Sequence, residues 1–398
     1  MIIKCNNIYT PTGIKKGFLT IENGILKNIS ESLLDSESTY IDYSDKNIFP
    51  GFIDIHIHGY GRGSFAYKGD SDSIKNMSKD VVQMGVTSYL LTSGTMPKKF
   101  LESSYNEAKK IIESFVKGEG AEPIGIHMEG PFINEKYIGM QRLDSVERAS
   151  IEKFKYYNKI SGNNIKLVTL APEIEGAIDL IKYLDKNNIV ISAGHTAATF
   201  DEMKVAIDAG LTNFTHVYSG MRGFHHRELG VVGAAMFFKN TYVELAKQSG
   251  ITVKSEAFDI MYRLKGDEKL VMMTDCLGLG GFPEGYSFYY YLRKTNFTME
   301  KKLLKLEMDN GDISYISTDD FEKLKDLELG FLESIKNIVD RLENKWLSVM
   351  KIACENPAKI AGVFNRKGSI EAGKDADFLI LDQEWNLSEV YCFGKKQI

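Results

Sequence analysis

Eight short apolar runs fill the middle of the chain, and amphipathic stretches such as IKNMSKDVVQMG and GAIDLIKYLDKNN separate most of them. The runs occupy residues 51–59, 86–94, 123–132, 165–173, 189–198, 213–219, 241–248 and 268–276. They are apolar on both faces, as expected for strands of a parallel sheet that helices cover. Eight strands alternating with helices over roughly 225 residues predict an α/β protein with a closed (β/α)8 TIM barrel.

The two ends of the chain have a different pattern. IIKCNNIYT and GFLTIENGILKNIS, with a hairpin turn at Asn23-Gly24, precede the barrel, and GSIEAGKDADFLILD and EVYCFGKKQI follow it. We therefore predict a small β-sandwich domain formed from both chain ends, residues 1–49 plus 365–398, beside a barrel domain of residues 50–364.

Residues 282–330 interrupt the barrel pattern. They contain the aromatic segment FPEGYSFYYYLRKTNFT and an Asp-Asn-Gly turn, which predict a strand-bearing insertion after the eighth strand. Residues 331–364 return to a helical pattern.

Charge and composition exclude several classes of partner. The formal net charge is −5 and no strongly basic stretch stands out, so we expect neither nucleic acid nor an anionic membrane surface as a partner. No apolar run approaches the ~18 residues that span a bilayer, and the N-terminus lacks the apolar segment of a signal peptide. The four cysteines are scattered without a CxxC pair. These features predict a cytoplasmic protein with reduced thiols.

All seven histidines lie between His56 and His226, and most of them end an apolar run. Because a barrel gathers the ends of its strands at one face, these imidazoles are expected to converge there. In GFIDIHIHG, His56 and His58 lie two residues apart and so point to the same side of a strand. They can grip one cation, although two chance histidines on a half-exposed strand would give the same pattern.

Glu129 in GIHMEGPF is the expected partner of two further histidines. A carboxylate at the end of a buried strand is costly unless it is paired or bound to a metal. His195 and His216 close the fifth and sixth runs, which favours a His2Glu site with an open fourth position for water. His127 shares the face of Glu129 and is either a support for such a site or a core histidine with satisfied hydrogen bonds.

Two further groups carry candidate chemistry. Asp275 closes LVMMTDC at the mouth of the expected barrel, where it could take a proton from water and pass it to a leaving group. It could instead cap a following helix. The loop HHRELG, which contains His226 and Arg227, suits a phosphate or carboxylate, or is a solvated charged loop.

Taken in order, several motifs resemble the N-acetylglucosamine-6-phosphate deacetylases of the amidohydrolase superfamily. They are PGFIDIHIHG, GIHMEGPFIN, LAPE, SAGHTAATFDE, THVYSGM, HHRELGVVGAA, MMTDC and ENPAKIAGVFNRKGSIEAGKDADFLILD. They span residues 50 to about 281 and then 355–382. The resemblance implies a metal-dependent barrel with a split β-sandwich.

The resemblance also implies a metal site and a catalytic acid/base. One divalent metal, zinc by default or iron, maps to Glu129, His195 and His216. His56 and His58 match the ligands of a second metal, so one or two ions are expected, with Glu129 able to bridge them. Asp275 matches the catalytic acid/base. Glu173 stands where other branches of the superfamily place a carboxylated lysine.

The remaining implied positions concern the substrate. Gln141 falls near the acyl carbonyl, and Arg227, beside His226, matches a residue that reaches the sugar phosphate of a neighbouring subunit, which implies a homodimer. The chain departs from the family where Ser219-Gly220 replaces Asn-Ala, and where Ser249-Gly250-Ile251-Thr252 replaces Asp-Gly-x-His. Leu229 also replaces a family proline, and the family's Leu-Ala-Gly-Ser stretch near 328–332 is absent.

These observations predict an enzyme, an amidohydrolase that deacetylates an N-acetyl amino sugar phosphate. N-acetylglucosamine 6-phosphate, giving glucosamine 6-phosphate and acetate, is the expected substrate. The alternatives are a deacetylase for N-acetylgalactosamine 6-phosphate, for an unphosphorylated sugar or for an N-acyl amino acid. A non-catalytic barrel that serves as a scaffold is a further alternative.

Overall fold

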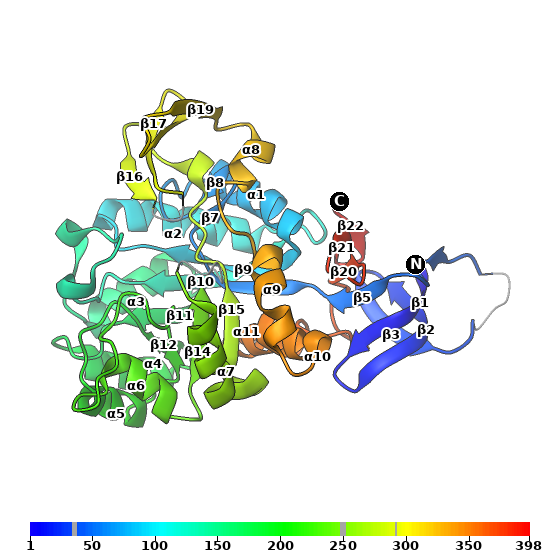
Figure 1. Ribbon diagram of the computed structural model, residues 1–398, viewed down its shortest axis with the longest axis horizontal. Coiled ribbons are helices and arrows are strands. Elements are labelled where there is room, and N and C mark those ends of the chain that lie inside the picture. The colour runs from blue at the N-terminus through cyan, green and yellow to red at the C-terminus, as the bar shows by residue number, and fades with distance from the viewer. Residues whose placement is uncertain (34–37, 247–251, 291–292) are drawn as a thin grey trace.

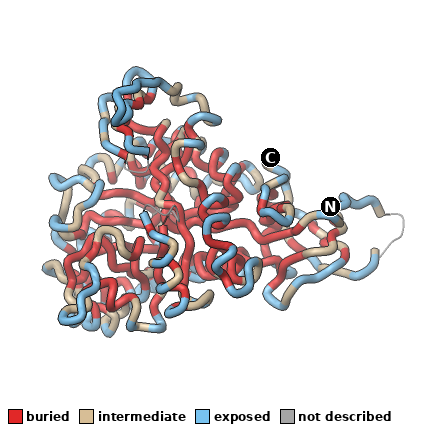
Figure 2. The backbone as a smooth tube through the Cα atoms, viewed as in Figure 1, coloured by how far each residue is buried: buried red, intermediate tan, exposed pale blue. Residues whose placement is uncertain are grey.

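A computed structural model of the chain describes residues 1–33, 38–246, 252–290 and 293–398. Figure 1 shows three regions: a large body with strands inside and helices outside, a sheet at the chain ends, and a smaller antiparallel sheet on top of the body. Buried backbone runs through the large body and continues into the sheet at the chain ends (Figure 2). No helix among the described residues is long and apolar enough to cross a bilayer.

The large body is built on eight parallel strands, each bonded to its neighbours in the order β15-β14-β13-β12-β11-β10-β9-β6. The strands are β6 (Phe52–Ile57), β9 (Val86–Ser93), β10 (Glu122–Glu129), β11 (Ile165–Leu170), β12 (Val190–Ala193), β13 (Asn213–Phe214), β14 (Tyr242–Ala246) and β15 (Leu270–Met273). The ring closes just beyond β15, where the backbone N–H of Asp275 donates to the carbonyl of His56 at 2.9 Å. The predicted TIM barrel is confirmed.

Most of the helices that cover the barrel bury one apolar face against it. In α4, Ala177, Leu180, Ile181 and Leu184 are buried at helical spacing. The helices are α1 (Ser71–Asp80), α2 (Lys98–Glu113), α3 (Ile151–Ile160), α4 (Ala177–Lys186), α5 (Phe200–Asp208), α6 (Gly230–Phe237), α7 (Ser255–Lys269), α8 (Phe321–Lys325), α9 (Phe331–Ile338), α10 (Lys345–Met350) and α11 (Asn356–Ile360). A π-helical turn, Lys351–Glu355, joins α10 to α11.

Strands from both chain ends form one hydrogen-bonded sheet. It contains β1 (Ile2–Thr10), β2 (Gly13–Glu22), β3 (Ile25–Ser30), β4 (Ile41–Asp42), β5 (Asn47–Pro50), β20 (Phe378–Leu381), β21 (Leu387–Cys392) and β22 (Lys395–Lys396). Antiparallel pairing of β5 with β20 joins the two ends of the chain. An isolated β-bridge also pairs Ile25, in β3, with Asp375. The division of the chain into domains at residues 49 and 365 remains a proposal.

The hairpin between β2 and β3 turns at Asn23 and Gly24, as the sequence predicts. Both residues have positive φ, 52° and 77°, a combination that matches the right-handed twist of the flanking strands.

The insertion is a four-stranded antiparallel sheet. Its strands are β16 (Ser287–Tyr290), β17 (Thr295–Glu300), β18 (Leu303–Met308) and β19 (Ile313–Ser317), paired in sequence order. Phe297 and Leu304 of this sheet are buried together with Leu277 and Leu279, which follow the last barrel strand. The insertion therefore packs over the carboxyl ends of the barrel strands, where it forms the top of the molecule in Figure 1. The hairpin of β7 (Gly59–Tyr60) and β8 (Gly63–Ser64) lies at the same end.

A buried ion network connects the barrel to the sheet at the chain ends. The Nζ atom of Lys367 lies 2.9 Å from a carboxylate oxygen of Glu122, at the start of β10. It lies 3.2 Å from Asp375 and also pairs with Asp377. The Lys367 side chain is only 1% exposed, so its charge depends on these carboxylates.

Candidate metal centre and active site

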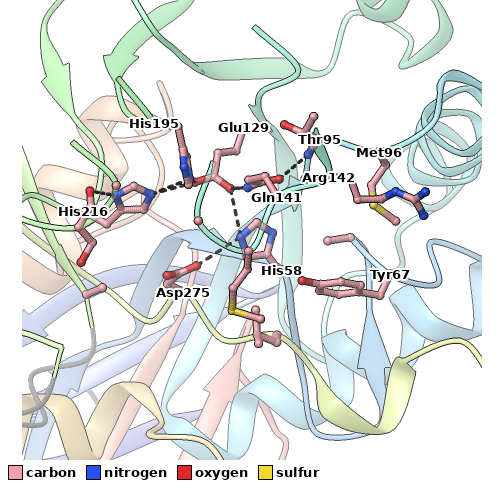
Figure 3. Close-up of a pocket in the computed structure, with 18 of the residues that line it drawn as sticks. His58, Tyr67, Thr95, Met96, Glu129, Gln141, Arg142, His195, His216 and Asp275 are labelled. Carbon is pink, nitrogen blue, oxygen red and sulfur yellow. Dashed lines mark hydrogen bonds and ion pairs between the residues drawn. The ribbon is translucent and has the colours of Figure 1, made fainter. Parts of the chain in front are cut away.

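Side chains from five barrel strands or the segments just after them meet at one end of the barrel (Figure 3). Their nitrogen and oxygen atoms form two groups with metal-ligand spacing. The first group is Glu129, His195 and His216, and the second is His56, His58 and Asp275. The structure therefore brings together all six residues that the sequence singled out for a metal or for proton transfer.

Glu129 lies between the two groups and contacts all four imidazoles. Its Oε1 atom lies 3.1 Å from Nε2 of His216 and 3.3 Å from the Nε2 atoms of His195 and His56. Its Oε2 atom lies 3.3 Å from Nε2 of His58. Oε1 thus contacts the first group and also His56 of the second, whereas Oε2 contacts His58, so the carboxylate lies between the two groups.

Asp275 completes the second group from the opposite side. Its Oδ1 atom lies 3.3 Å from Nε2 of His58 and 3.6 Å from Nε2 of His56. The Asp275 side chain is 30% exposed, whereas that of Glu129 is 1% exposed. Asp275 is therefore the carboxylate of this centre that can meet water. No helix follows Asp275 directly, so the alternative of a helix cap does not apply.

Three of these residues have an unusual backbone conformation. His195, His216 and Asp275 have φ values of 47°, 32° and 53°, in the left-handed region that costs non-glycine residues of order 1–3 kcal/mol. Each lies two residues beyond the end of its strand. The turn this creates lets the side chain fold over the barrel mouth. Such strain is retained where the surrounding structure enforces it, most often at functional sites.

The four imidazoles of the centre share one orientation. In each, Nδ1 lies within hydrogen-bond distance of an oxygen acceptor outside the two groups, so that Nε2 faces inward. The acceptors are Glu244 Oε2 for His56 (3.1 Å), Thr92 O for His58 (3.2 Å), Tyr137 O for His195 (2.7 Å) and Ser219 O for His216 (3.1 Å). With the proton on Nδ1, the lone pair of Nε2 is free for a metal.

Glu244 is a functional candidate that the sequence reasoning missed. It lies in β14 and is fully buried, as is His56. Its Oε1 atom has no hydrogen-bond partner among the described residues. The signal was present in the sequence, since Glu244 is the one acidic residue in the apolar run TYVELA.

The electrostatics of the centre call for a cation. Burial alone would lower the pKa of His56, but the surrounding carboxylates, Glu129 first, raise it well above its usual value. Burial would also lower the pKa of His58, but Asp275 and Glu129 outweigh this effect and raise the pKa to about 9. Burial opposes ionisation of Glu129, yet the imidazoles hold the pKa of this carboxyl well below its usual range. The site is built for positive charge between the ligands.

Two further contacts test whether a metal fits. Nε2 of His56 is buried without a hydrogen-bond partner in the described part of the chain. The Nε2 atoms of His195 and His216 face each other at 3.2 Å, and in both rings the backbone acceptor lies at the other nitrogen, Nδ1. A divalent cation satisfies these nitrogens, and a set of imidazoles with carboxylates suits zinc or iron.

His127 belongs to the core. It is fully buried, its Nε2 lies 2.7 Å from Thr169 Oγ1, and its Nδ1 lies 3.1 Å from the carbonyl oxygen of Ile55. Burial and the neighbouring His56 lower its pKa well below the usual value. Its ring packs edge-on against His56 with centroids 4.6 Å apart. It packs against His56 and belongs to neither group of candidate ligands.

Glu173 also has a structural role, because it accepts hydrogen bonds from neighbouring loops. Its carboxylate accepts hydrogen bonds from Thr196 Oγ1 at 2.5 Å, from the Ala197 backbone at 2.6 Å and from Asn134 Nδ2 at 2.9 Å. It holds the loop that follows His195.

A cavity opens above the two groups, and most of the predicted substrate residues line it. Gln141, Ser219, Gly220 and Thr252 are among them. Gln141 Oε1 accepts from the Thr95 backbone at 2.6 Å, and Gln141 Nε2 donates to Glu129 Oε2 at 2.6 Å. The carboxamide thus lies beside the candidate metal ligands (Figure 3).

His226 and Arg227 do not line this cavity. Both are exposed on the loop between His216 and α6, and the ring of His226 packs against His225 with centroids 4.3 Å apart. Ser249, Gly250 and Ile251, also singled out by the sequence, lie outside the described residues.

Five other residues that line the cavity were not anticipated. Tyr67 comes from the loop after β8, Arg142 from the loop after β10, and Tyr286, Tyr289 and Tyr290 from the insertion. The aromatic run FYYY was visible in the sequence, but the position of Tyr289 and Tyr290 at the cavity follows from long-range packing.

Comparisons with known proteins agree with this geometry. Residues 47–396 match the amidohydrolase family. The chain is 32% identical to an N-acetylglucosamine-6-phosphate deacetylase of Bacillus subtilis (strain 168), over 96% of this chain and 92% of that protein. It is 28% identical to an N-acetylgalactosamine-6-phosphate deacetylase of Escherichia coli O157:H7, over 87% of this chain and 86% of the relative.

A solved structure supports the fold. The N-acetylglucosamine-6-phosphate deacetylase from Pasteurella multocida superposes with a TM-score of 0.81 at 24% identity, over 100% of this chain and 99% of that one.

Proposed function

The chain belongs to the amidohydrolase family, and from this we propose that it hydrolyses the acetamide of N-acetylglucosamine 6-phosphate. The products are glucosamine 6-phosphate and acetate. The observation on which the proposal rests is that four imidazoles and two carboxylates meet at a cavity, which all of them except the buried His56 line. An enzyme of the N-acetylgalactosamine 6-phosphate class is the second candidate, because one relative carries that name.

Glu129, His195 and His216 would hold one divalent ion, and His56 and His58 a second, with Glu129 between them. Zinc is the default for such ligands and iron fits them also. When bound, such an ion would polarise the amide carbonyl and would lower the pKa of water to about 7.

Asp275 is the proposed acid and base. Its partly exposed carboxylate takes the proton of the attacking water as the C–O bond forms at the acyl carbon. It then gives this proton to the nitrogen as the C–N bond breaks. Amide and water are thereby converted to amine and acetate with no other reagent.

Gln141 is the proposed donor to the acyl oxygen. Its Nε2–H group now donates to Glu129, and a short rotation of the carboxamide would redirect it toward a bound substrate. A donor aimed at the developing oxyanion lowers the barrier more than it strengthens binding. Ser219, Gly220 and Thr252 are proposed to contact the sugar, since they line the same cavity.

A panel of substrates tests the proposal. Acetate release should be highest with N-acetylglucosamine 6-phosphate, compared with N-acetylgalactosamine 6-phosphate, N-acetylglucosamine and an N-acetyl amino acid. A higher rate with another member would reassign the substrate. A metal-loaded protein that releases acetate from none of them would favour a scaffold over an enzyme of this class.

We also propose a homodimer in which Arg227 and His226 reach the substrate of the neighbouring subunit. Arg227 is exposed and does not line the cavity of its own chain, and Phe224 and Phe237 nearby are 58% and 64% exposed. A cytoplasmic location is proposed because the four cysteines are free and buried.

A further inference from the structure

Several residues that line the cavity besides the candidate metal ligands have their own chemistry. They are Tyr67, Tyr286, Tyr289, Arg142, Met96 and Met140, and in Figure 3 Arg142 and Met96 lie on the opposite side of the view from His216. Among the described residues that line the cavity, Arg142 is the one lysine or arginine. Within the described part of the chain, Arg142 is therefore the one permanent positive charge that an anionic group of the substrate meets in this cavity.

The positions expected to contact the sugar phosphate do not supply that charge. Ser219, Gly220 and Thr252 line the cavity but are uncharged. Arg227 lies elsewhere on the surface of the same chain. A phosphate bound within one subunit therefore needs another cation.

Arg142 is available for a ligand. Its Nε and Nη2 atoms donate to Asp144 at 3.1 and 2.6 Å, while Nη1 makes no hydrogen bond within the described residues. The side chains of Arg142 and Asp144 are 46% and 63% exposed. An ion pair this exposed contributes little free energy, so a phosphate can share the guanidinium or displace Asp144 from it.

Tyr67 and Tyr286 line the same cavity as Arg142. The ring of Tyr67 packs against Phe282 and Tyr286, with centroid distances of 4.5 and 5.2 Å. In Figure 3 the hydroxyl of Tyr67 lies on the side of its ring that faces His58. Burial, Tyr286 and the nearby carboxylates raise the pKa of Tyr67 well above its usual value. Its phenol therefore stays protonated and can donate to a sugar hydroxyl.

We propose that Arg142 anchors the phosphate of the substrate and that Tyr67 and Tyr286 hold the sugar ring between this anchor and the metal ligands. This inference rests on the proposed function. It assigns a phosphate site to residues of one chain, in addition to any cation from a second subunit. Arginine suits this site because its planar group binds phosphate oxygens in pairs.

The experiment compares Arg142→Gln with the wild type on N-acetylglucosamine 6-phosphate and on N-acetylglucosamine. The ratio of kcat/KM for the phosphorylated to the unphosphorylated sugar should fall by about 10- to 100-fold, the effect of losing a charged hydrogen bond. Most of the loss should appear in KM, and Arg142→Lys should recover part of it. Arg148→Gln is the matched control, because Arg148 forms a similarly exposed pair with Glu175 away from the cavity.

Inhibition by inorganic phosphate gives a second measurement. The inhibition constant should rise at least fivefold in Arg142→Gln and stay within twofold in Arg148→Gln. The inference is overturned if Arg142→Gln matches Arg148→Gln in both measurements, or if Arg227→Gln alone lowers the ratio.

If the wild type releases acetate from neither sugar, the proposed function fails. Calorimetric binding of inorganic phosphate then tests Arg142 separately. Weaker binding by Arg142→Gln than by Arg148→Gln supports the anion site, and equal binding by these variants, or none by the wild type, overturns it.

Discussion

A hydrogen bond between two fully buried side chains, His56 and Glu244, orients the imidazole of His56 in the second group of proposed metal ligands. Glu244 Oε2 lies 3.1 Å from Nδ1 of His56 and so fixes the proton on that nitrogen. Nε2 then points toward Glu129 and Asp275. A carboxylate behind a ligating histidine orients the ring and raises its basicity.

Replacing Glu244 with glutamine should therefore weaken the binding of the ion proposed at His56 and His58 more than that of the ion at His195 and His216. We expect the affinity for the second ion to fall about 10- to 100-fold, while the ion at Glu129, His195 and His216 stays bound. Titration against a metal-binding dye measures both. Glu113→Gln, at the exposed end of α2, is the control. Equal affinities in Glu244→Gln and the control would contradict this role.

Asp275→Asn tests the proton transfer. The amide keeps the shape of the carboxylate but cannot accept a proton, so kcat should fall by ~10²–10⁴. The variant should keep at least the ion held by Glu129, His195 and His216, which metal analysis checks. Near-normal turnover in a metal-loaded Asp275→Asn enzyme would remove Asp275 from the mechanism.

All eight barrel strands were predictable from the sequence, because a buried parallel strand is a continuous apolar run. The ends of the strands were less predictable. Residues 213–219 were expected as one strand, whereas β13 spans only Asn213–Phe214. The left-handed conformation of His216 turns the chain there, and apolar patterning does not report such a turn. Part of the predicted strand 241–248 lies outside the described residues.

Helix α7 contains a buried lysine with a pH-dependent contribution to stability. Lys265 Nζ donates to the carbonyl oxygens of Phe238 and Thr241, at 2.6 and 3.0 Å. Burial, with a smaller effect of Lys269, lowers the pKa of Lys265 from 10.5 to about 8. Between these values the unfolded state binds more protons than the folded state, so the free energy of unfolding rises with pH.

Lys265→Met isolates this effect. Between about pH 8 and 10, the free energy of unfolding of the wild type should increase relative to that of the variant. Denaturant unfolding at several pH values measures the difference. Parallel pH profiles for the two proteins would contradict the lowered pKa of Lys265.

In the whole molecule, the active site depends on segments that are distant in sequence. The proposed metal ligands were predictable because each ends a recognisable strand, and the closed barrel brings those ends together. The positions of Arg142 and of the tyrosines of the insertion were not predictable. The sequence pattern of a loop or of an added sheet does not indicate where that segment packs. Glu244 was missed because a strand pattern does not reveal which buried neighbour an acid meets.

The ion network around Lys367 tests how firmly the barrel and the chain-end sheet are coupled. Lys367→Ala leaves Glu122, Asp375 and Asp377 with one fewer positive charge in a buried position, so we expect a loss of about 3–5 kcal/mol in the free energy of unfolding. Lys110→Ala, which breaks an exposed pair with Glu107, should cost at most about 1 kcal/mol. Similar losses in the two variants would show that the network is not a buried support.

Elemental analysis of the purified, dialysed protein tests the whole proposal, because every step depends on a divalent ion among the imidazoles and Glu129. We predict about one to two ions of zinc or iron per chain, the number that two groups of ligands can hold. A folded protein that retains no stoichiometric metal, even after incubation with zinc or iron, would contradict it.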